Sequence, residues 1–204
     1  PFSLGGKHRA FDDSRNMFPE VFRAVREILP RAIIVENVKG LLRSSFEPYF
    51  TYILRAIADP ELKQRSRESW RDHDARLLRS MNRRNDSRVK YRVCSQLLNA
   101  ADFGVAQRRE RVFIVAFRDD IGLQWNGLAP THSEDALLFD KWVSREYWSD
   151  HGIEAPRFQA ATQTRIKKLW RSGRPTTLRW RTVRDALRDL PEPQRAPRRP
   201  RADR

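Results

Sequence analysis

The chain has 204 residues, of which 41 are lysine or arginine and 26 are aspartate or glutamate, so its formal net charge is +15. This length suffices for one domain with a hydrophobic core, and the charge favours a polyanionic partner, nucleic acid before an anionic membrane surface. The single cysteine excludes an internal disulfide framework and a zinc site of several cysteines, and no apolar run approaches the ~20 residues of a membrane-spanning helix.

The first third of the chain alternates between helix and strand patterns. Residues 1–14 are rich in glycine and polar side chains and predict a loop. Apolar residues at helical spacing predict a helix over residues 14–29, ended by Pro30, and a second helix over 45–58. Between them, "AIIV" at 32–35 has the β-branched composition of a buried strand. This succession is typical of a doubly wound α/β sheet.

The remaining sequence is less regular. Residues 59–88 form an arginine-rich stretch in which Trp70 stands almost alone among polar residues, and we interpret it as a helical or partly disordered insertion. Strand composition returns at 90–98 and 111–117, and short helices are expected at 136–148 and 180–190. We therefore expect three parts: residues 1–118 with the insertion, a variable region at 119–190, and a disordered basic tail at 191–204.

A carboxylate stands directly after the first predicted strand, at Glu36. Open α/β sheets bind their ligands at the carboxyl ends of the strands, so this position favours a functional role. Two structural roles compete on position alone: Glu36 could cap the following turn or pair with a nearby arginine.

A second polar group precedes the strand predicted at 111–117. Gln107, Arg109 and Arg111 alternate, so in an extended segment their side chains share one face. A solvated charge run would explain the arginines but not their strict alternation with Gln107. The pattern favours three hydrogen-bonding groups that point the same way.

Three motifs in order resemble those of the DNA (cytosine-5)-methyltransferases. "PFSLGGKHRAFDDSR" is similar to the end of that family's Pro-Cys-Gln motif and the mobile loop behind it, "ENVKGLL" to its Glu-Asn-Val motif, and "LLNAADFGVAQRRERVFIVAF" to its Gln-x-Arg-x-Arg motif. The resemblance covers roughly residues 1–118. It implies part of a Rossmann-like S-adenosylmethionine-dependent methyltransferase sheet with helices on both faces, followed by a poorly structured basic C-terminal region.

The resemblance gives Glu36 and the arginines chemical roles. In this family a cysteine thiolate adds to C6 of a cytosine flipped out of the duplex. Glu36 would then protonate or hydrogen-bond N3 and hold the exocyclic amino group, and desolvation at a strand end would favour its protonated form. Arg111 would bind the O2 carbonyl, and Arg109 would support the pocket or a phosphate. Glu36, Arg109 and Arg111 are thus the candidate catalytic residues.

Other residues have expected supporting roles by the same resemblance. Asn37 and Gly104 would hold the backbone at the site. The implied methyl donor is S-adenosylmethionine, with no metal, and the implied partner is double-stranded DNA, at the nucleoid of a bacterial cytoplasm. The candidate DNA-binding residues are Ser3, Gly6, Lys7, Arg15 and Gln107.

The chain also departs from the family pattern. It begins just after the position of the Pro-Cys-Gln nucleophile and carries no Phe-x-Gly-x-Gly cofactor loop, and Ala106 replaces a usual proline. Cys94 is interpreted as a small core residue rather than the nucleophile. We therefore expect an internal fragment that is inactive alone, with the missing segments or a second chain as a partner. A non-catalytic DNA-binding remnant is the alternative, ahead of a basic structural or RNA-associated protein.

Overall fold

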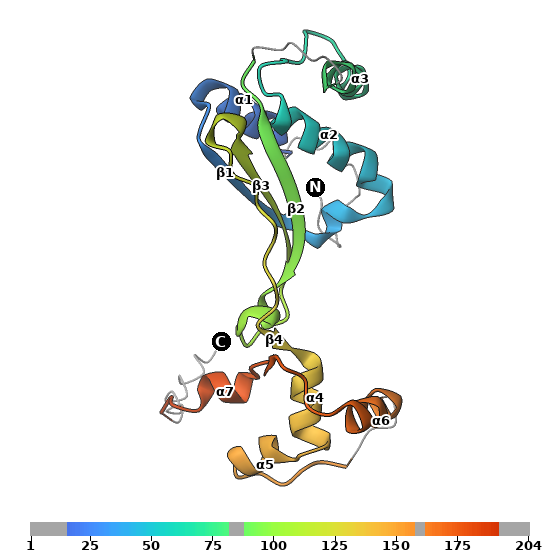
Figure 1. Ribbon diagram of the computed structural model, residues 1–204, viewed down its shortest axis with the longest axis vertical. Coiled ribbons are helices and arrows are strands. Elements are labelled where there is room, and N and C mark those ends of the chain that lie inside the picture. The colour runs from blue at the N-terminus through green and yellow to red at the C-terminus, as the bar shows by residue number, and fades with distance from the viewer. Residues whose placement is uncertain (1–15, 82–87, 158–161, 192–204) are drawn as a thin grey trace, which may run out of the picture. The chain divides into compact units, whose positions relative to one another are not determined.

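The structure is a computed structural model, and its description covers residues 16–81, 88–157 and 162–191. These residues form two compact units (Figure 1). The first unit comprises the described residues up to Ala100 together with Arg109–Pro130, and the second comprises Ala101–Arg108 together with the described residues from Thr131 onward. The chain therefore passes between the units at three points.

A three-stranded sheet forms the base of the first unit. Its strands, β1 (Ala32–Val38), β2 (Tyr91–Asn99) and β3 (Glu110–Arg118), lie in the order β1-β3-β2. The mixed α/β class is confirmed, and the strands expected at 32–35 and 111–117 are present and pair with each other. The doubly wound pattern had implied a mostly parallel sheet, and for these strands that is wrong, because β3 runs antiparallel to both neighbours. A buried apolar run has the same composition in either direction, so composition could not reveal the orientation.

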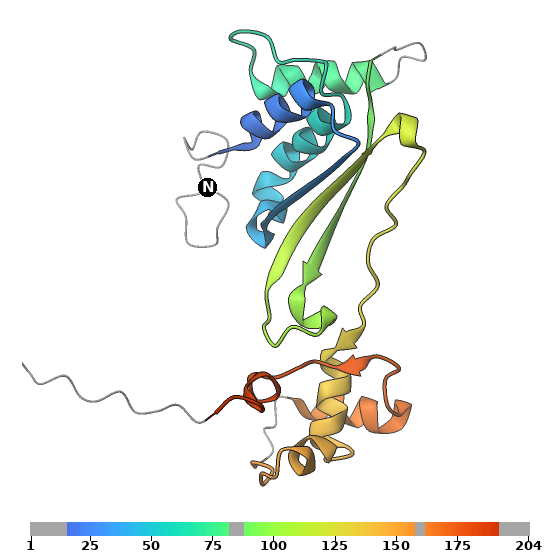
Figure 2. The same ribbon diagram turned by 90° about the vertical axis from the view of Figure 1, so that its left-hand side faces the viewer.

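Helices of the first unit pack against one face of this sheet (Figure 2). They are α1 (Phe18–Ile28), α2 (Glu47–Ala58) and α3 (Trp70–Met81), and two short 3₁₀ turns, Lys39–Leu42 and Ser44–Phe46, lead from β1 into α2. The helices predicted at 14–29 and 45–58 are thus present with shifted starts. In the described ranges, no helix of this unit forms the second layer that a doubly wound sheet would have. The shared core contains Phe18, Val25, Ile33, Leu41, Phe46, Tyr49, Tyr52, Ile53, Ala56, Ile57, Leu77, Tyr91, Ile114 and Ala116.

The arginine-rich stretch at 59–88 contributes to this core through α3. Trp70 packs edge-on against Tyr49, with ring centroids 5.3 Å apart, and lies 5.6 Å from Tyr52. The Tyr52 hydroxyl lies 3.1 Å from Nδ1 of the buried His73. Trp70 is therefore part of an aromatic cluster, and its apparent isolation in the sequence is explained by partners from a different helix.

A buried carboxylate connects α2, α3 and the start of β2. Asp59 is 2% exposed, and its Oδ2 lies 2.5 Å from Lys90 Nζ and 3.2 Å from Arg88 Nη2. Ser80 Oγ donates to the same oxygen at 2.8 Å. Burying a lone carboxylate is unfavourable, so the two cations and the hydroxyl make this position possible.

The second face of the sheet is covered in part by an extended segment. The Gln96 side chain donates to Leu128 O at 3.0 Å and accepts from Leu128 N at 2.9 Å, which fixes residues 122–130 across β2 and β3. Gly127 has a φ of +83°, and a Cβ there would lie 2.9 Å from Gln96 Oε1, so only glycine fits this close approach. Ile34 in β1 remains 71% exposed on this face.

The second unit is mostly helical. A short parallel strand pair, β4 (His132–Ser133) with β5 (Leu178–Arg179), connects segments that lie before α4 and after α6 in the chain. Its helices are α4 (Glu134–Trp142), α5 (Glu146–Asp150), α6 (Gln163–Ser172) and α7 (Val183–Leu187). The helices expected at 136–148 and 180–190 correspond to α4, α5 and α7, whereas α6 was not predicted.

Two side-chain motifs stabilise this second unit. Tyr147 is buried against Trp148, with ring centroids 4.9 Å apart, and its hydroxyl lies 3.0 Å from Thr182 Oγ1. Thr182 also begins α7 through a capping box with Asp185. Among the residues that the structure describes, no helix is long and apolar enough to cross a membrane.

The Asp59 cluster gives a test of this packing. Asp59→Asn leaves Lys90 and Arg88 without their buried anion, and we expect the free energy of unfolding to fall by about 3 kcal/mol. Glu27→Gln is a matched control, because Glu27 pairs with Arg23 at the surface, where both side chains are more than half exposed. That change should cost less than about 1 kcal/mol. Urea denaturation would measure both, and equal losses would contradict a structural role for Asp59.

Candidate active site at the strand ends

The carboxyl end of β1 lies beside the beginning of β3. In the antiparallel register Val38 faces Arg111 and Glu36 faces Phe113. On the other side of β3, Leu98 near the end of β2 also faces Arg111. Three strand termini therefore meet at one edge of the sheet, and this edge holds the residues that the motifs predicted.

Glu36 and Arg111 form an ion pair at this edge. Arg111 Nε lies 2.7 Å from Glu36 Oε1. The two residues are diagonal neighbours on one face of the antiparallel pair, a spacing that long side chains can bridge. Glu36 and the Gln-x-Arg-x-Arg segment, which supply the candidate catalytic residues, thus meet at this edge.

The pair leaves one polar atom of each partner available. Arg111 Nη1 donates to Glu110 O at 2.8 Å, so two of the three guanidinium nitrogens are engaged. Within the described part of the chain, Arg111 Nη2 and Glu36 Oε2 have no hydrogen-bond partner. The edge therefore presents an unused donor beside an unused acceptor.

A second ion pair borders the first. Lys39 Nζ lies 2.8 and 2.9 Å from the two carboxylate oxygens of Glu110. This bidentate contact connects the turn after β1 to the first residue of β3. It holds the backbone at Glu110, whose carbonyl oxygen in turn orients Arg111.

Asn37 and Gly104 have local backbone roles. Asn37 Oδ1 accepts a hydrogen bond from Val38 N at 2.8 Å, so this side chain supports the turn rather than facing solvent as a binding group. Gly104 has a φ of +85°, and a Cβ there would lie 3.0 Å from His132 Cε1. Both observations support the supporting roles expected for these residues.

The alternating residues before β3 are divided between the two units. Arg109 belongs to the first unit, where its N–H donates to Asn99 Oδ1 at 3.1 Å and its carbonyl accepts from Ala100 N. Gln107 belongs to the second unit, and both side chains are exposed. Asn99 was not singled out from the sequence, although it belongs to the Asn-Ala pair of the third motif.

Two expectations for this site need correction. The described residues do not bury Glu36, whose side chain is 47% exposed, so the desolvated pocket expected around it is absent from this part of the chain. Cys94 was expected to be a small core residue, but it lies half-buried in β2 opposite Val115 and is not part of the core cluster. The single cysteine is thus a half-buried strand residue.

The remaining expected DNA-binding residues lie outside the described ranges. They are Ser3, Gly6, Lys7 and Arg15, and the predicted basic tail from residue 192 onward also falls outside them. No group of three or more His, Cys, Asp or Glu side chains within the described residues could hold a metal ion.

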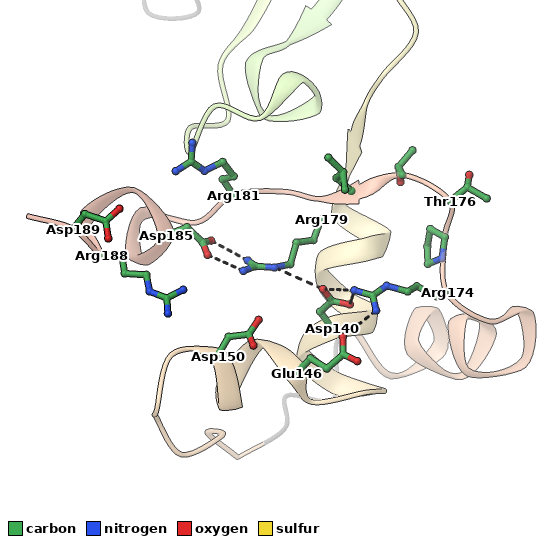
Figure 3. Close-up of a pocket in the computed structure, with 13 residues that line it drawn as sticks. Asp140, Glu146, Asp150, Arg174, Thr176, Arg179, Arg181, Asp185, Arg188 and Asp189 are labelled. Atoms are coloured by element: carbon green, nitrogen blue, oxygen red, sulfur yellow. Dashed lines mark hydrogen bonds and ion pairs between the residues drawn. The ribbon is translucent and has the colours of Figure 1, made fainter.

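The second unit contains a separate polar cavity of about 730 Å³ (Figure 3). An ion network crosses it: Arg174 Nη2 lies 2.9 Å from Asp140 Oδ1 and Arg174 Nη1 lies 2.9 Å from Glu146, while Arg179 pairs with Asp185 at 2.8 Å. Arg181 and Arg188 also line it. Such alternating donors and acceptors suit a polar ligand, not an apolar one.

Burial and pairing act in opposite directions on the two main carboxylates of this network. Burial raises the pKa of Asp140 above its ordinary value, and the nearby Arg174 only partly offsets this. Burial also opposes the charge on Asp185, but hydrogen bonds from Arg179 and Thr182 outweigh it and hold the pKa of Asp185 well below its ordinary value.

Comparison with known proteins finds relatives among the type II methyltransferases. The chain is 38% identical over 132 residues to the type II methyltransferase M.AquIA of Picosynechococcus sp., covering 64% of this chain and 44% of that protein. It is 34% identical over 165 residues to the type II methyltransferase M.NgoMIV of Neisseria gonorrhoeae, covering 79% and 44%. It thus spans less than half the length of these relatives.

The family profile covers still more of the chain. The profile described as C-5 cytosine-specific DNA methylase matches residues 1–60 and 72–192, leaving out a short part of the arginine-rich stretch. Both the Glu36 and the Arg111 strand ends lie within the match. The chain therefore belongs to the C-5 cytosine-specific DNA methylase family.

Proposed function

We propose that the chain supplies the cytosine-binding part of a type II DNA (cytosine-5)-methyltransferase of a bacterial restriction–modification system. The reaction would transfer a methyl group from S-adenosylmethionine to C5 of a cytosine flipped out of duplex DNA, at the nucleoid in the cytoplasm. The observation that carries the proposal is the Glu36–Arg111 pair at the shared edge of β1 and β3. The activity would require segments that carry the nucleophile and the cofactor loop.

The unused atoms of this pair complement the edge of cytosine. Cytosine presents an amino donor at N4 and acceptors at N3 and O2. Glu36 Oε2 is available to accept from N4 or, when protonated, to donate to N3, while Arg111 Nη2 is available to donate to O2. Thymine lacks the N4 donor and carries a proton on N3, so the same pair would discriminate against it.

The two side chains would also assist the reaction. Addition of a nucleophile at C6 moves electron density toward N3 and O2 of the ring. A proton donor at Glu36 and a fixed cation at Arg111 would stabilise that charge in the transition state. The half-exposed carboxylate would be desolvated when the flipped base covers it.

The supporting residues follow from their placement. Arg109 is exposed beside the hairpin-like end of β2 and β3, where it would contact a phosphate or the pocket, and Gln107 would contact DNA. Asn37 and Gly104 would keep the backbone of their turns in place.

A basic surface on α6 is the DNA-contacting face that we assign to the second unit. Leu169 is the buried residue of this helix, whereas Lys167, Lys168 and Arg171 point away from it and are exposed. Neighbouring arginines are already paired, as Arg165 is with Glu134 and Asp135. Lys167, Lys168 and Arg171 form no ion pair with described residues, so their charges are available to phosphates.

The first test concerns Glu36. With an upstream segment carrying the cofactor loop and Pro-Cys-Gln and the downstream closing motifs restored, in cis or as a second chain, methyl transfer from labelled S-adenosylmethionine to cytosine should be measurable. Glu36→Gln keeps the shape but removes the proton source, so kcat should fall by roughly 10²–10⁴-fold while DNA affinity changes little. Arg111→Ala should also lower kcat, because the donor to O2 is lost.

Two controls accompany this test. Glu27→Gln makes the same chemical change at an exposed carboxylate of α1 that pairs with Arg23, and Cys94→Ser changes the single thiol of the chain. Both should retain kcat within about threefold. An inactive Cys94→Ser protein together with an active Glu36→Gln protein would overturn the assignment. Duplex binding without methyl transfer in the restored protein would instead support the DNA-binding remnant.

The second test concerns α6. The chain should bind duplex DNA with little sequence preference, and its affinity should fall steeply with salt. Changing Lys167, Lys168 and Arg171 to Gln should reduce the slope of log K against log salt by about 2 to 3, because each lost phosphate contact contributes about 0.9.

A matched triple variant distinguishes the loss of an α6–DNA contact from the loss of overall positive charge. Lys63, Arg65 and Arg67 are exposed cations in the segment that the family profile leaves out. Changing these three to Gln removes the same charge and should alter the slope by less than about 1. Fluorescence anisotropy across a salt series would measure both, and equal slopes for the two triple variants would contradict an α6 contact.

A further inference from the structure

The loop between β2 and β3 is built into the second unit. This loop, Ala101–Arg108, carries Gln107. Thr131 N donates to Asp102 O at 3.0 Å, and Thr131 Oγ1 donates to the same oxygen at 3.3 Å. The glycine at 104 packs directly on the His132 ring. The main chain of the loop is thereby attached to the start of β4.

A tryptophan distant in the sequence adds a side-chain anchor. Trp180 Nε1 donates to Asp102 Oδ1 at 2.8 Å, and the indole is buried, with 8% exposed. Arg108 Cζ lies 5.1 Å from the centroid of the Trp180 ring, so the indole contacts both ends of the loop. A hydrogen bond to a carboxylate is stronger than a neutral one, and burial protects it from water.

Trp180 also belongs to the segment that borders the cavity of the second unit. It directly follows β5, and its two neighbours, Arg179 and Arg181, line the cavity of Figure 3. This three-residue segment therefore lines the cavity through Arg179 and Arg181 and contacts the loop through Trp180. Trp142 and Trp148 of this unit lie against each other instead, with ring centroids 5.5 Å apart.

We propose that Trp180 and Asp102 are positioning residues whose hydrogen bond holds the Ala101–Arg108 loop, and with it Gln107, to the cavity-bearing unit. The role of Gln107 on DNA rests on the proposed function. Gln107 is exposed and makes no hydrogen bond with described residues, so its place is set by the loop backbone alone. Trp180 and Asp102 fix that backbone without touching the base.

The first experiment measures the loop in the chain itself. Trp180→Phe keeps an aromatic face but removes the donor, Asp102→Ala removes the acceptor, and Asp102→Asn keeps an acceptor oxygen. Hydrogen exchange of the amides at Gly104 and Thr131 should be at least about tenfold faster in the first two variants, since each loses a charge-assisted hydrogen bond. Asp102→Asn keeps a neutral acceptor and should exchange clearly more slowly than Asp102→Ala, and the amides of β1 and β3 should be unchanged in all three.

The second experiment measures the consequence for catalysis in the restored protein. Trp180→Phe and Asp102→Ala should lower kcat by about tenfold with KM for DNA within about twofold, and Asp102→Asn should restore kcat. Equal losses in Asp102→Ala and Asp102→Asn, or unchanged exchange at Gly104 and Thr131, would overturn the proposal. Exchange does not depend on methyl transfer, so an inactive parent protein would count against the proposed function alone.

Discussion

The direction of β3 is the constraint on which the candidate site depends. The Gln-x-Arg-x-Arg segment precedes β3, so its arginines lie wherever that strand begins. Because β3 is antiparallel to β1, it begins beside the carboxyl end of β1, and Arg111 reaches Glu36. A parallel β3 would begin at the opposite end of β1, roughly 20 Å away at about 3.3 Å per residue. One reversed strand thus converts two separate motifs into a single site.

The sequence predicted the partners of this site but not the geometry that joins them. Motif order and spacing indicated Glu36 and Arg111 as candidates, whereas composition does not reveal strand direction, and a mostly parallel sheet was expected instead. The half-exposed state of Glu36 was also missed, because the exposure of a side chain at a strand end depends on packing partners that are distant in the sequence. The Asp102–Trp180 bond joins residues 78 positions apart, a separation at which no local pattern operates. Helix α6 was missed for a different reason: its single buried residue, Leu169, gives too little apolar periodicity.

The division of the chain gives the third motif a double attachment. Gln107 belongs to the unit with the polar cavity and the basic α6 face, while Arg109 and Arg111 belong to the unit with Glu36. The boundary falls within the motif, between Arg108 and Arg109, without any intervening linker. The third motif is thus continuous in sequence across the boundary, with Gln107 and Arg108 in one unit and Arg109 and Arg111 in the other.

The ion network of the second unit has a built-in order of dissociation in acid. Arg174 and Arg179 carry guanidinium groups, which keep their charge at any ordinary pH, so their ion pairs break when the carboxylates take up protons. Asp140, with its raised pKa, takes up a proton first; over that interval the folded chain binds more protons there than the unfolded chain, so acidification does not itself favour unfolding at this residue. Asp185, with its lowered pKa, stabilises the fold above its unfolded value, and this stabilisation is lost only as the pH falls through the much lower folded value. Acidification would thus weaken the contact of Arg174 with Asp140 in α4 before that of Arg179 with Asp185 in α7.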